Sequence, residues 1–252
     1  IYNIVRVGYT RINWTFLTSL PSRKPESAGI YTAIIGTLDL MLLTVLFAIP
    51  VGVGAGIYLE EYAKKSRLSS LLEINISNLA GVPSIIYGLL GLGIFVRFFN
   101  FGGSILSGSL TLSLLILPII IVATREAIKA VPHSLKEASF ALGASKWQTI
   151  KDVVLPSSFG GILTGIILSL SRAIGETAPL IVVGAMAYVP FVPQSIFDTF
   201  SVLPMQIFNW TTRPQQGFAI AASGAIIVLL LITFIMNGIA VYFRNRWQKK
   251  LQ

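Results

Sequence analysis

The stretch LMLLTVLFAIPVGVGAGIYL, Leu40 to Leu59, contains twenty residues and no charged side chain. A helix needs about 20 consecutive apolar residues to cross the hydrocarbon core of a bilayer. Three further windows of this 252-residue chain also lack Asp, Glu, Lys and Arg: Ile74 to Val96, Phe98 to Thr124 and Pro214 to Phe243. Each window is long enough for one span, so the sequence predicts a protein embedded in a membrane.

A fifth span is predicted within the window from Val153 to Phe197, where Arg172 and Glu176 are the only charges. The rest of that window reads as an apolar outer loop. An open sheet cannot cross lipid with unpaired edges, and the alternating pattern of barrel strands is absent. The expected fold is therefore all-α and polytopic, with five spans.

The composition excludes several functional classes. Only 12% of the residues are charged, against roughly 25% in soluble domains. The net charge of +9 arises from basic residues between the apolar windows, where topology and lipid headgroups account for them better than nucleic acid does. Cysteine is absent, His133 is interpreted as a solvated loop residue, and no catalytic constellation or metal-ligand cluster is present, so an enzyme is not predicted.

The distribution of Lys and Arg predicts the orientation. With five spans, three basic segments fall on one side, which the positive-inside rule assigns to the cytoplasm together with the C-terminus. Four basic residues before the first span contradict that rule unless a sixth span precedes Ile1. We therefore expect residues 1–28 to be an external segment after that span, with the Pro, Ser and Gly content of a surface loop in its second half, and residues 29–252 to form the membrane domain. The basic segments are Lys64, Lys65, Arg67; Arg125, Lys129, Lys136, Lys146, Lys151; and Arg244, Arg246, Lys249, Lys250.

Two other features concern packing and the outer surface. Gly52 with Gly56, and Gly161 with Gly165, have the spacing that lets helices approach closely in lipid. The outer loop Tyr188 to Gly217 is rich in aromatic residues and prolines. Its aromatic side chains fit interfacial anchors or a docking surface for an external partner.

The segment between the third and fourth spans, residues 125–155, is longer than a simple connection requires. Ser134 to Glu137 and Ser145 to Gln148 match capping boxes, and Gly143 between them fits a left-handed helix end. We expect a helix, a glycine turn and a second helix before the next span. The first helix either lies on lipid headgroups or docks on a partner.

The sequence EASFALGASKWQTIKDVVLP, Glu137 to Pro156, resembles the cytoplasmic coupling motif of bacterial ABC-importer permeases. The resemblance implies that this helix docks on a cytosolic ATPase. No P-loop motif is present in the chain, so ATP and Mg²⁺ would be used by the partner and this chain would bind no cofactor. The matching positions are Glu137, Ala138, Gly143, Leu155 and Pro156, while Ser139 replaces the second Ala of the motif and Val153 replaces Ile.

Arg172 and Glu176 are the candidate site. A charge near mid-bilayer costs about 2.5 to 3.5 kcal/mol on insertion scales, so such residues are functional candidates. Four residues apart, they share a helix face with Ser169 and can pair. For a helix starting near Gly160, Arg172 would lie roughly halfway across the hydrocarbon. The pair is either structural or an oxyanion site, in which a guanidinium offers forked donors and a carboxylate keeps binding weak.

The segment SRAIGETAPL, Ser171 to Leu180, resembles oxyanion permeases. GIYLEEYA (Gly56 to Ala63) and LAGVPSIIYGLLGLGIF (Leu79 to Phe95) resemble phosphate-transport permeases of the PstA type. This resemblance implies the type I importer architecture in a prokaryotic cell membrane and a substrate path through Arg172, Glu176, Ser169 and Thr177. The implied partners are a homologous second permease, an ATPase dimer and an extracytoplasmic phosphate-binding protein. Sulfate or molybdate import, a secondary transporter or channel, and a membrane scaffold remain as alternatives.

Overall fold

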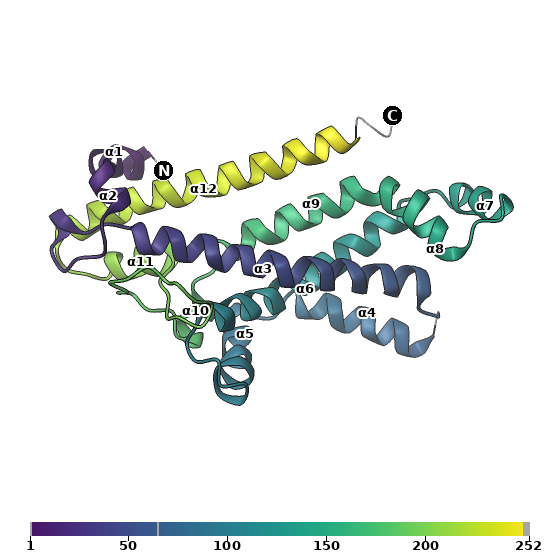
Figure 1. Cartoon of the computed structure of the whole chain (residues 1–252), viewed down its shortest axis with the longest axis horizontal. Helices are drawn as coiled ribbons and strands as arrows, with labels where there is room; N and C mark the ends of the chain where they lie inside the picture. The colour runs from purple at the N-terminus through teal and green to yellow at the C-terminus, as the bar shows by residue number, and fades with distance from the viewer. Residues whose placement is uncertain (1, 65, 249–252) are drawn as a thin grey trace. The chain divides into compact units, whose positions relative to one another are not determined.

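The computed structural model describes residues 2–64 and 66–248, and every regular element within them is a helix (Figure 1). Lys65, Lys249 and Lys250 of the predicted basic segments lie outside the described residues. The chain divides into two compact units. The first unit comprises Ile1–Leu46, Pro83–Leu115 and Arg172–Ile235; the second comprises Phe47–Val82, Ile116–Ser171 and Met236–Gln252.

The described residues contain four single helices that are long and apolar enough to cross a membrane, or five spans if one bent pair is counted. This agrees with the predicted polytopic α-helical class. The predicted span Ile74 to Val96 is the bent pair, Ser69–Leu79 and Ser84–Phe98, whose axes differ by 104°. The break contains Pro83. Proline lacks an N–H donor and keeps the preceding residue extended, so the helix is interrupted here. The single helices are Tyr31–Tyr62, Ile105–Lys129, Lys146–Ala173 and Gln216–Arg246.

The first unit contains the short helices at the N-terminus and those between residues 178 and 211. It also contains one part of each of three long helices, α3 (Tyr31–Ile57), α6 (Ile105–Lys129) and α12 (Gln216–Gln248). Its other elements are α1 (Tyr2–Gly8), η1 (Tyr9–Arg11), α2 (Trp14–Thr18), η2 (Pro25–Ser27), α5 (Ser84–Gly91), η4 (Leu92–Phe98), α10 (Ala178–Val183) and α11 (Leu203–Thr211).

The N-terminal tail has the Pro, Ser and Gly content of a surface loop, but tertiary contacts stabilise short helices in it. Asn13 caps α2 by accepting a hydrogen bond from the Phe16 amide at 2.7 Å. Phe16 is buried and packs against Trp210, with ring centroids 6.1 Å apart. A Cβ on Gly8 would lie 2.6 Å from the Ser223 carbonyl carbon, so α1 packs directly on the backbone of α12 (Figure 1).

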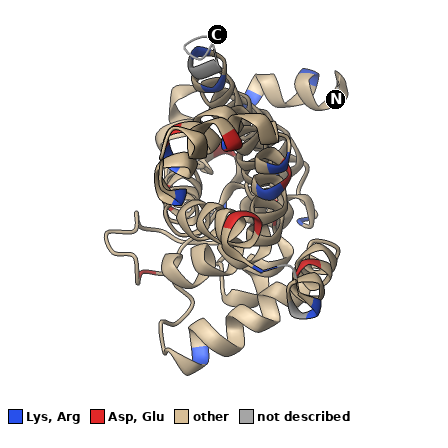
Figure 2. Ribbon diagram, turned by 90° about the vertical axis from the view of Figure 1, so that its right-hand side faces the viewer, with Lys and Arg blue, Asp and Glu red and all other residues tan. Residues whose placement is uncertain are grey.

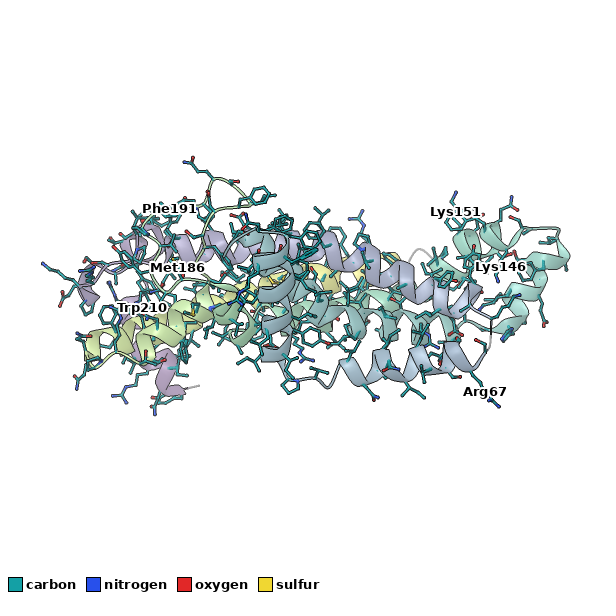
Figure 3. The ribbon with its side chains drawn as sticks, turned by 90° about the horizontal axis from the view of Figure 1, so that it is seen from below. Arg67, Lys146, Lys151, Met186, Phe191 and Trp210 are labelled. Carbon is teal, nitrogen blue, oxygen red and sulfur yellow. The ribbon has the colours of Figure 1, made fainter. Side chains whose placement is uncertain are left out.

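Aromatic residues of the segment Tyr188 to Gly217, predicted to be an outer loop, divide between the core and the surface. Phe200 and Trp210 are buried, and the ring of Trp210 packs against that of Phe218, 6.0 Å away. These side chains are core residues, so interfacial anchoring is the wrong interpretation for them. Phe191 and Phe197 are exposed and keep that interpretation open. Figure 3 labels Phe191 and Trp210, together with Met186.

The second unit consists of helices that pack through small residues. Its elements are parts of α3, α6 and α12, together with η3 (Tyr58–Tyr62), α4 (Arg67–Leu79), α7 (His133–Ala141), α8 (Lys146–Thr149), η5 (Ile150–Val154) and most of α9 (Leu155–Ala173). A Cβ on Gly52 would lie 2.7 Å from Ile120, and one on Gly56 would lie 2.7 Å from Thr124. The predicted close packing at these glycines is confirmed.

Replacing Gly165 with Ala is expected to destabilise the second unit. The new methyl group would overlap the Cβ of Ala123, and overpacking of this kind costs about 1 to 3 kcal/mol. Adding Ala123→Gly removes the clash and should restore stability except for about 1 kcal/mol of lost helix propensity. Thermal unfolding of the single and double variants measures this coupling. Gly238→Ala, where no atom lies within 4 Å of the new Cβ, serves as control; additive losses in the double variant would contradict the contact.

Candidate functional site

Arg172 and Glu176 lie at the end of a helix and not in its middle. The helical stretch begins at Lys146 and ends at Ala173, so the prediction that the helix starts near Gly160 is wrong. The expected depth of Arg172, about halfway across the hydrocarbon, stays a prediction. The helix continues through Pro156. A π turn, Ile150–Val154, lies just before this proline and leads directly into α9. Beyond Ala173 the amides of Gly175 and Glu176 donate to the carbonyls of Arg172 and Ala173, both at 3.2 Å, and form a turn before α10.

The turn brings the two charges together. Nε of Arg172 lies 3.3 Å from Oε1 of Glu176, and their side chains are 37% and 18% exposed. Their neighbours Ala173 and Ile174 are buried. The predicted pairing is therefore present in the first unit, across a helix break and not along a continuous helix face. A partly exposed, partly neutralised guanidinium can bind an anion without holding it permanently.

The other predicted path residues differ in what their hydroxyl groups do. Thr177 precedes α10, is partly buried, and makes no capping hydrogen bond through its side chain. Ser169 is fully buried in α9, where its hydroxyl donates to the Gly165 carbonyl at 2.8 Å. The turn thus places Thr177 near the ion pair in sequence and structure, whereas the Ser169 hydroxyl is satisfied by its own helix.

Tyr87 is a residue of this site that the sequence reasoning missed. It is buried in α5, and its phenol interacts electrostatically with Arg172. A Cβ on the adjacent Gly88 would lie 2.7 Å from the Cα of Pro179, which shows how tightly α5 packs against the start of α10. The only signal in the sequence is one tyrosine within an apolar stretch.

The second candidate site is the connection between α6 and α9. The predicted capping box at Ser134 is wrong: α7 begins at His133 after Pro132, with no side-chain cap, so Ser134 lies inside the helix. The box at Ser145 is confirmed, since its amide donates to Oε1 of Gln148 at 2.8 Å and its hydroxyl accepts from the Gln148 amide. Gly143 has φ +83°, the predicted left-handed turn.

The connection over residues 125–155 is mostly helical. The helix α6 continues to Lys129, and α8 runs through η5 into α9 without a break. Ile150 and Val154 are buried, and this apolar face extends the transmembrane helix beyond the apolar window. The predicted order of helix, glycine turn and second helix is therefore present, but the second helix continues into the next span, so α7 is the one separate helix of this connection.

Three residues of the coupling motif are exposed on α7 and the turn after it. Glu137, Ala138 and Gly143 are exposed, whereas Leu155 and Pro156 are partly buried. The hydroxyl of Ser139 lies 2.9 Å from that of Thr149 and joins α7 to α8. Large apolar side chains here face solvent: Leu135, Phe140, Leu142 (89% exposed) and Trp147. Such a patch marks an interaction site.

Ion pairs attach this connection and α4 to the rest of the second unit. Lys136 pairs with Glu61, and Lys146 lies 4.9 Å from the centroid of the Tyr62 ring. In α6 the buried Arg125 contacts two carboxylates, that of Glu60 at 3.5 Å and that of Glu73 at 2.7 Å. Figure 2 views the end of this unit where both signs of charge gather, and Figure 3 labels Lys146. The sequence predicted these basic residues only as topological signals.

Comparison with known proteins identifies the family. Residues 48–249 match the model of the family described as "Binding-protein-dependent transport system inner membrane component". The chain belongs to this family. It is 33% identical to the probable ABC transporter permease protein YqgI of Bacillus subtilis, over 98% of this chain and 88% of that protein. It is 34% identical to the phosphate transport system permease protein PstA 1 of Mycobacterium tuberculosis H37Rv, over 93% of this chain and 76% of that protein.

Solved structures agree with this assignment at the level of the fold. A chain of the inward-facing MetNI methionine ABC transporter aligns with a TM-score of 0.69 at 16% identity, covering 86% of this chain and 97% of that one. A chain of a bacterial ABC transporter that imports alginate gives 0.70 at 14% identity, covering 97% and 89%. The protein is thus a membrane permease subunit of an ABC importer, and the predicted architecture and resemblance are confirmed.

Proposed function

We propose that this permease forms half of the translocation path of an ATP-driven importer of inorganic phosphate. The observation that carries the proposal is the Arg172–Glu176 pair in the turn between α9 and α10. Its guanidinium offers planar, forked donors that match a tetrahedral oxyanion. The similarity to PstA permeases supports phosphate as the cargo.

The carboxylate of Glu176 favours phosphate over sulfate. A carboxylate only accepts hydrogen bonds, and inorganic phosphate near neutral pH is a mixture of its singly and doubly protonated forms, each of which keeps at least one O–H donor. Phosphate can therefore donate a hydrogen bond to Glu176 while it accepts from Arg172. Sulfate carries no proton at this pH and would meet only repulsion from the carboxylate.

The expected partners include an ATPase that would bind the exposed helix α7. We infer that α7 and the turn at Gly143 dock on an ATPase subunit, which binds ATP and Mg²⁺ and drives closure. A homologous second permease completes the path, and an external phosphate-binding protein delivers the anion. In this arrangement residues 1–28 are external, residues 29–252 form the membrane domain, and the C-terminus is cytoplasmic in a prokaryotic cell membrane.

A competition experiment tests the cargo. The full complex is reconstituted in proteoliposomes with ATP and its binding protein, and uptake of radiolabelled phosphate is measured. A hundredfold excess of unlabelled phosphate should suppress the signal, whereas sulfate or molybdate at the same concentration should leave it unchanged. Equal competition by sulfate would assign the importer to another oxyanion. Uptake that needs an ion gradient and not ATP would indicate a secondary transporter.

A further inference from the structure

An apolar groove of about 660 Å³ lies between α3 and α9 in the second unit. Val53 and Ile57 line one wall, Phe159 and Leu163 line the other, and Lys151 is the one charged residue of its lining. The volume lies within the range of roughly 300 to 1,000 Å³ typical of ligand sites. The groove is therefore large enough for a ligand that is apolar over most of its length.

Gly54 opens this groove. The sequence GVGAG contains three alternating glycines, and Gly52 and Gly56 pack against α6, where an added Cβ would meet Ile120 or Thr124. A Cβ on Gly54 meets no atom within 4 Å. Helix packing thus explains why Gly52 and Gly56 are glycines. It does not explain Gly54, which faces open space.

Lys151 is a cation without a carboxylate partner in the described part of the chain. By contrast, Lys129 pairs with Glu126 and Lys136 pairs with Glu61. Lys151 is exposed and lies in η5, at the start of the wall that α9 contributes (Figure 3). A phosphate group at this end of the groove would have a charge partner.

We infer that the groove binds one anionic phospholipid. An acyl chain lies along Gly54 between α3 and α9, and the headgroup phosphate pairs with Lys151. Basic residues beside apolar clefts between membrane helices recognise anionic headgroups. The proposed lipid site does not involve the Arg172–Glu176 pair. The inference therefore does not depend on which oxyanion the subunit transports.

Photolabelling of the assembled complex tests this site. Two probes are compared, phosphatidylglycerol and phosphatidylcholine with the same photoreactive acyl chain. Phosphatidylglycerol should label the peptides that contain Gly54 and Phe159 more strongly. Lys151→Gln should reduce that labelling about fivefold, the factor that corresponds to one headgroup charge contact, and should leave labelling by phosphatidylcholine unchanged.

Filling the groove gives an independent arm. Gly54→Leu should abolish labelling by both lipids without lowering the melting temperature, because its side chain enters open space. Gly238→Leu, at another glycine with no atom near its Cβ, and Lys64→Gln, at another exposed lysine, are the matched controls and should label as the wild type does. Equal labelling by both lipids in the wild type, or cross-links to a protein segment in place of lipid, would overturn the proposal even if Gly54→Leu failed to assemble.

Discussion

Replacing Arg172 with Gln is expected to abolish phosphate uptake while the complex still assembles. The substitution would remove the bidentate, charge-assisted contact that we propose with phosphate, and each such hydrogen bond contributes about 1.5 to 3 kcal/mol. Two of them correspond to a loss of roughly 10² to 10⁴-fold in transport. Because the Arg172 side chain is 37% exposed, its loss should have little effect on folding. Initial rates of radiolabelled phosphate uptake in proteoliposomes measure the effect.

Companion variants separate an anion site from a structural ion pair. Arg172→Lys keeps the charge without the fork and should retain a small part of the activity. Glu176→Gln keeps an oxygen that can accept the phosphate proton but removes the charge that neutralises the guanidinium, so KM should fall together with kcat as phosphate is released more slowly. Arg6→Gln, at an exposed arginine of the same unit, is the control. Normal uptake by Arg172→Gln, or a lowered melting temperature in both pair variants with KM unchanged, would assign the pair a structural role.

Replacing Leu142 with Asp should eliminate binding of the ATPase. Leu142 is 89% exposed at the end of α7, and burying a leucine contributes about 1.5 to 3 kcal/mol. The aspartate loses this contribution and adds an unpaired charge at the interface. We expect affinity to fall at least about 100-fold, which co-purification and ATP-dependent uptake would detect. The melting temperature of the permease should not change.

Two further variants define what this surface does. Leu20→Asp changes a leucine that is also exposed but lies in the first unit, and it should leave ATPase binding intact. Glu137→Lys reverses an exposed charge on α7 and should let the ATPase bind but uncouple hydrolysis from transport. If Leu142→Asp still bound the ATPase and transported phosphate, α7 would be a helix that rests on lipid headgroups.

Several features of the site followed from local sequence because they depend on neighbouring residues. The spacing of Arg172 and Glu176 predicts their pairing, and the Ser145 box and the Gly143 turn each require only four or five consecutive residues. The predicted start of the helix near Gly160 was wrong, and its end at Ala173 does not follow from hydropathy alone. Apolar residues continue past Ala173, while the backbone turns at Gly175.

The sequence by itself determined the membrane-spanning helical class, since uncharged windows of some 20 residues have few other stable states. It also indicated the family and the candidate pair. Only the tertiary structure decided which residues meet across the chain: Phe16 on Trp210, Arg125 on Glu60 and Glu73, and Tyr87 near Arg172. These partners are separated by many residues, and their contacts depend on how the helices pack, for which a linear pattern of apolar and charged residues contains no signal.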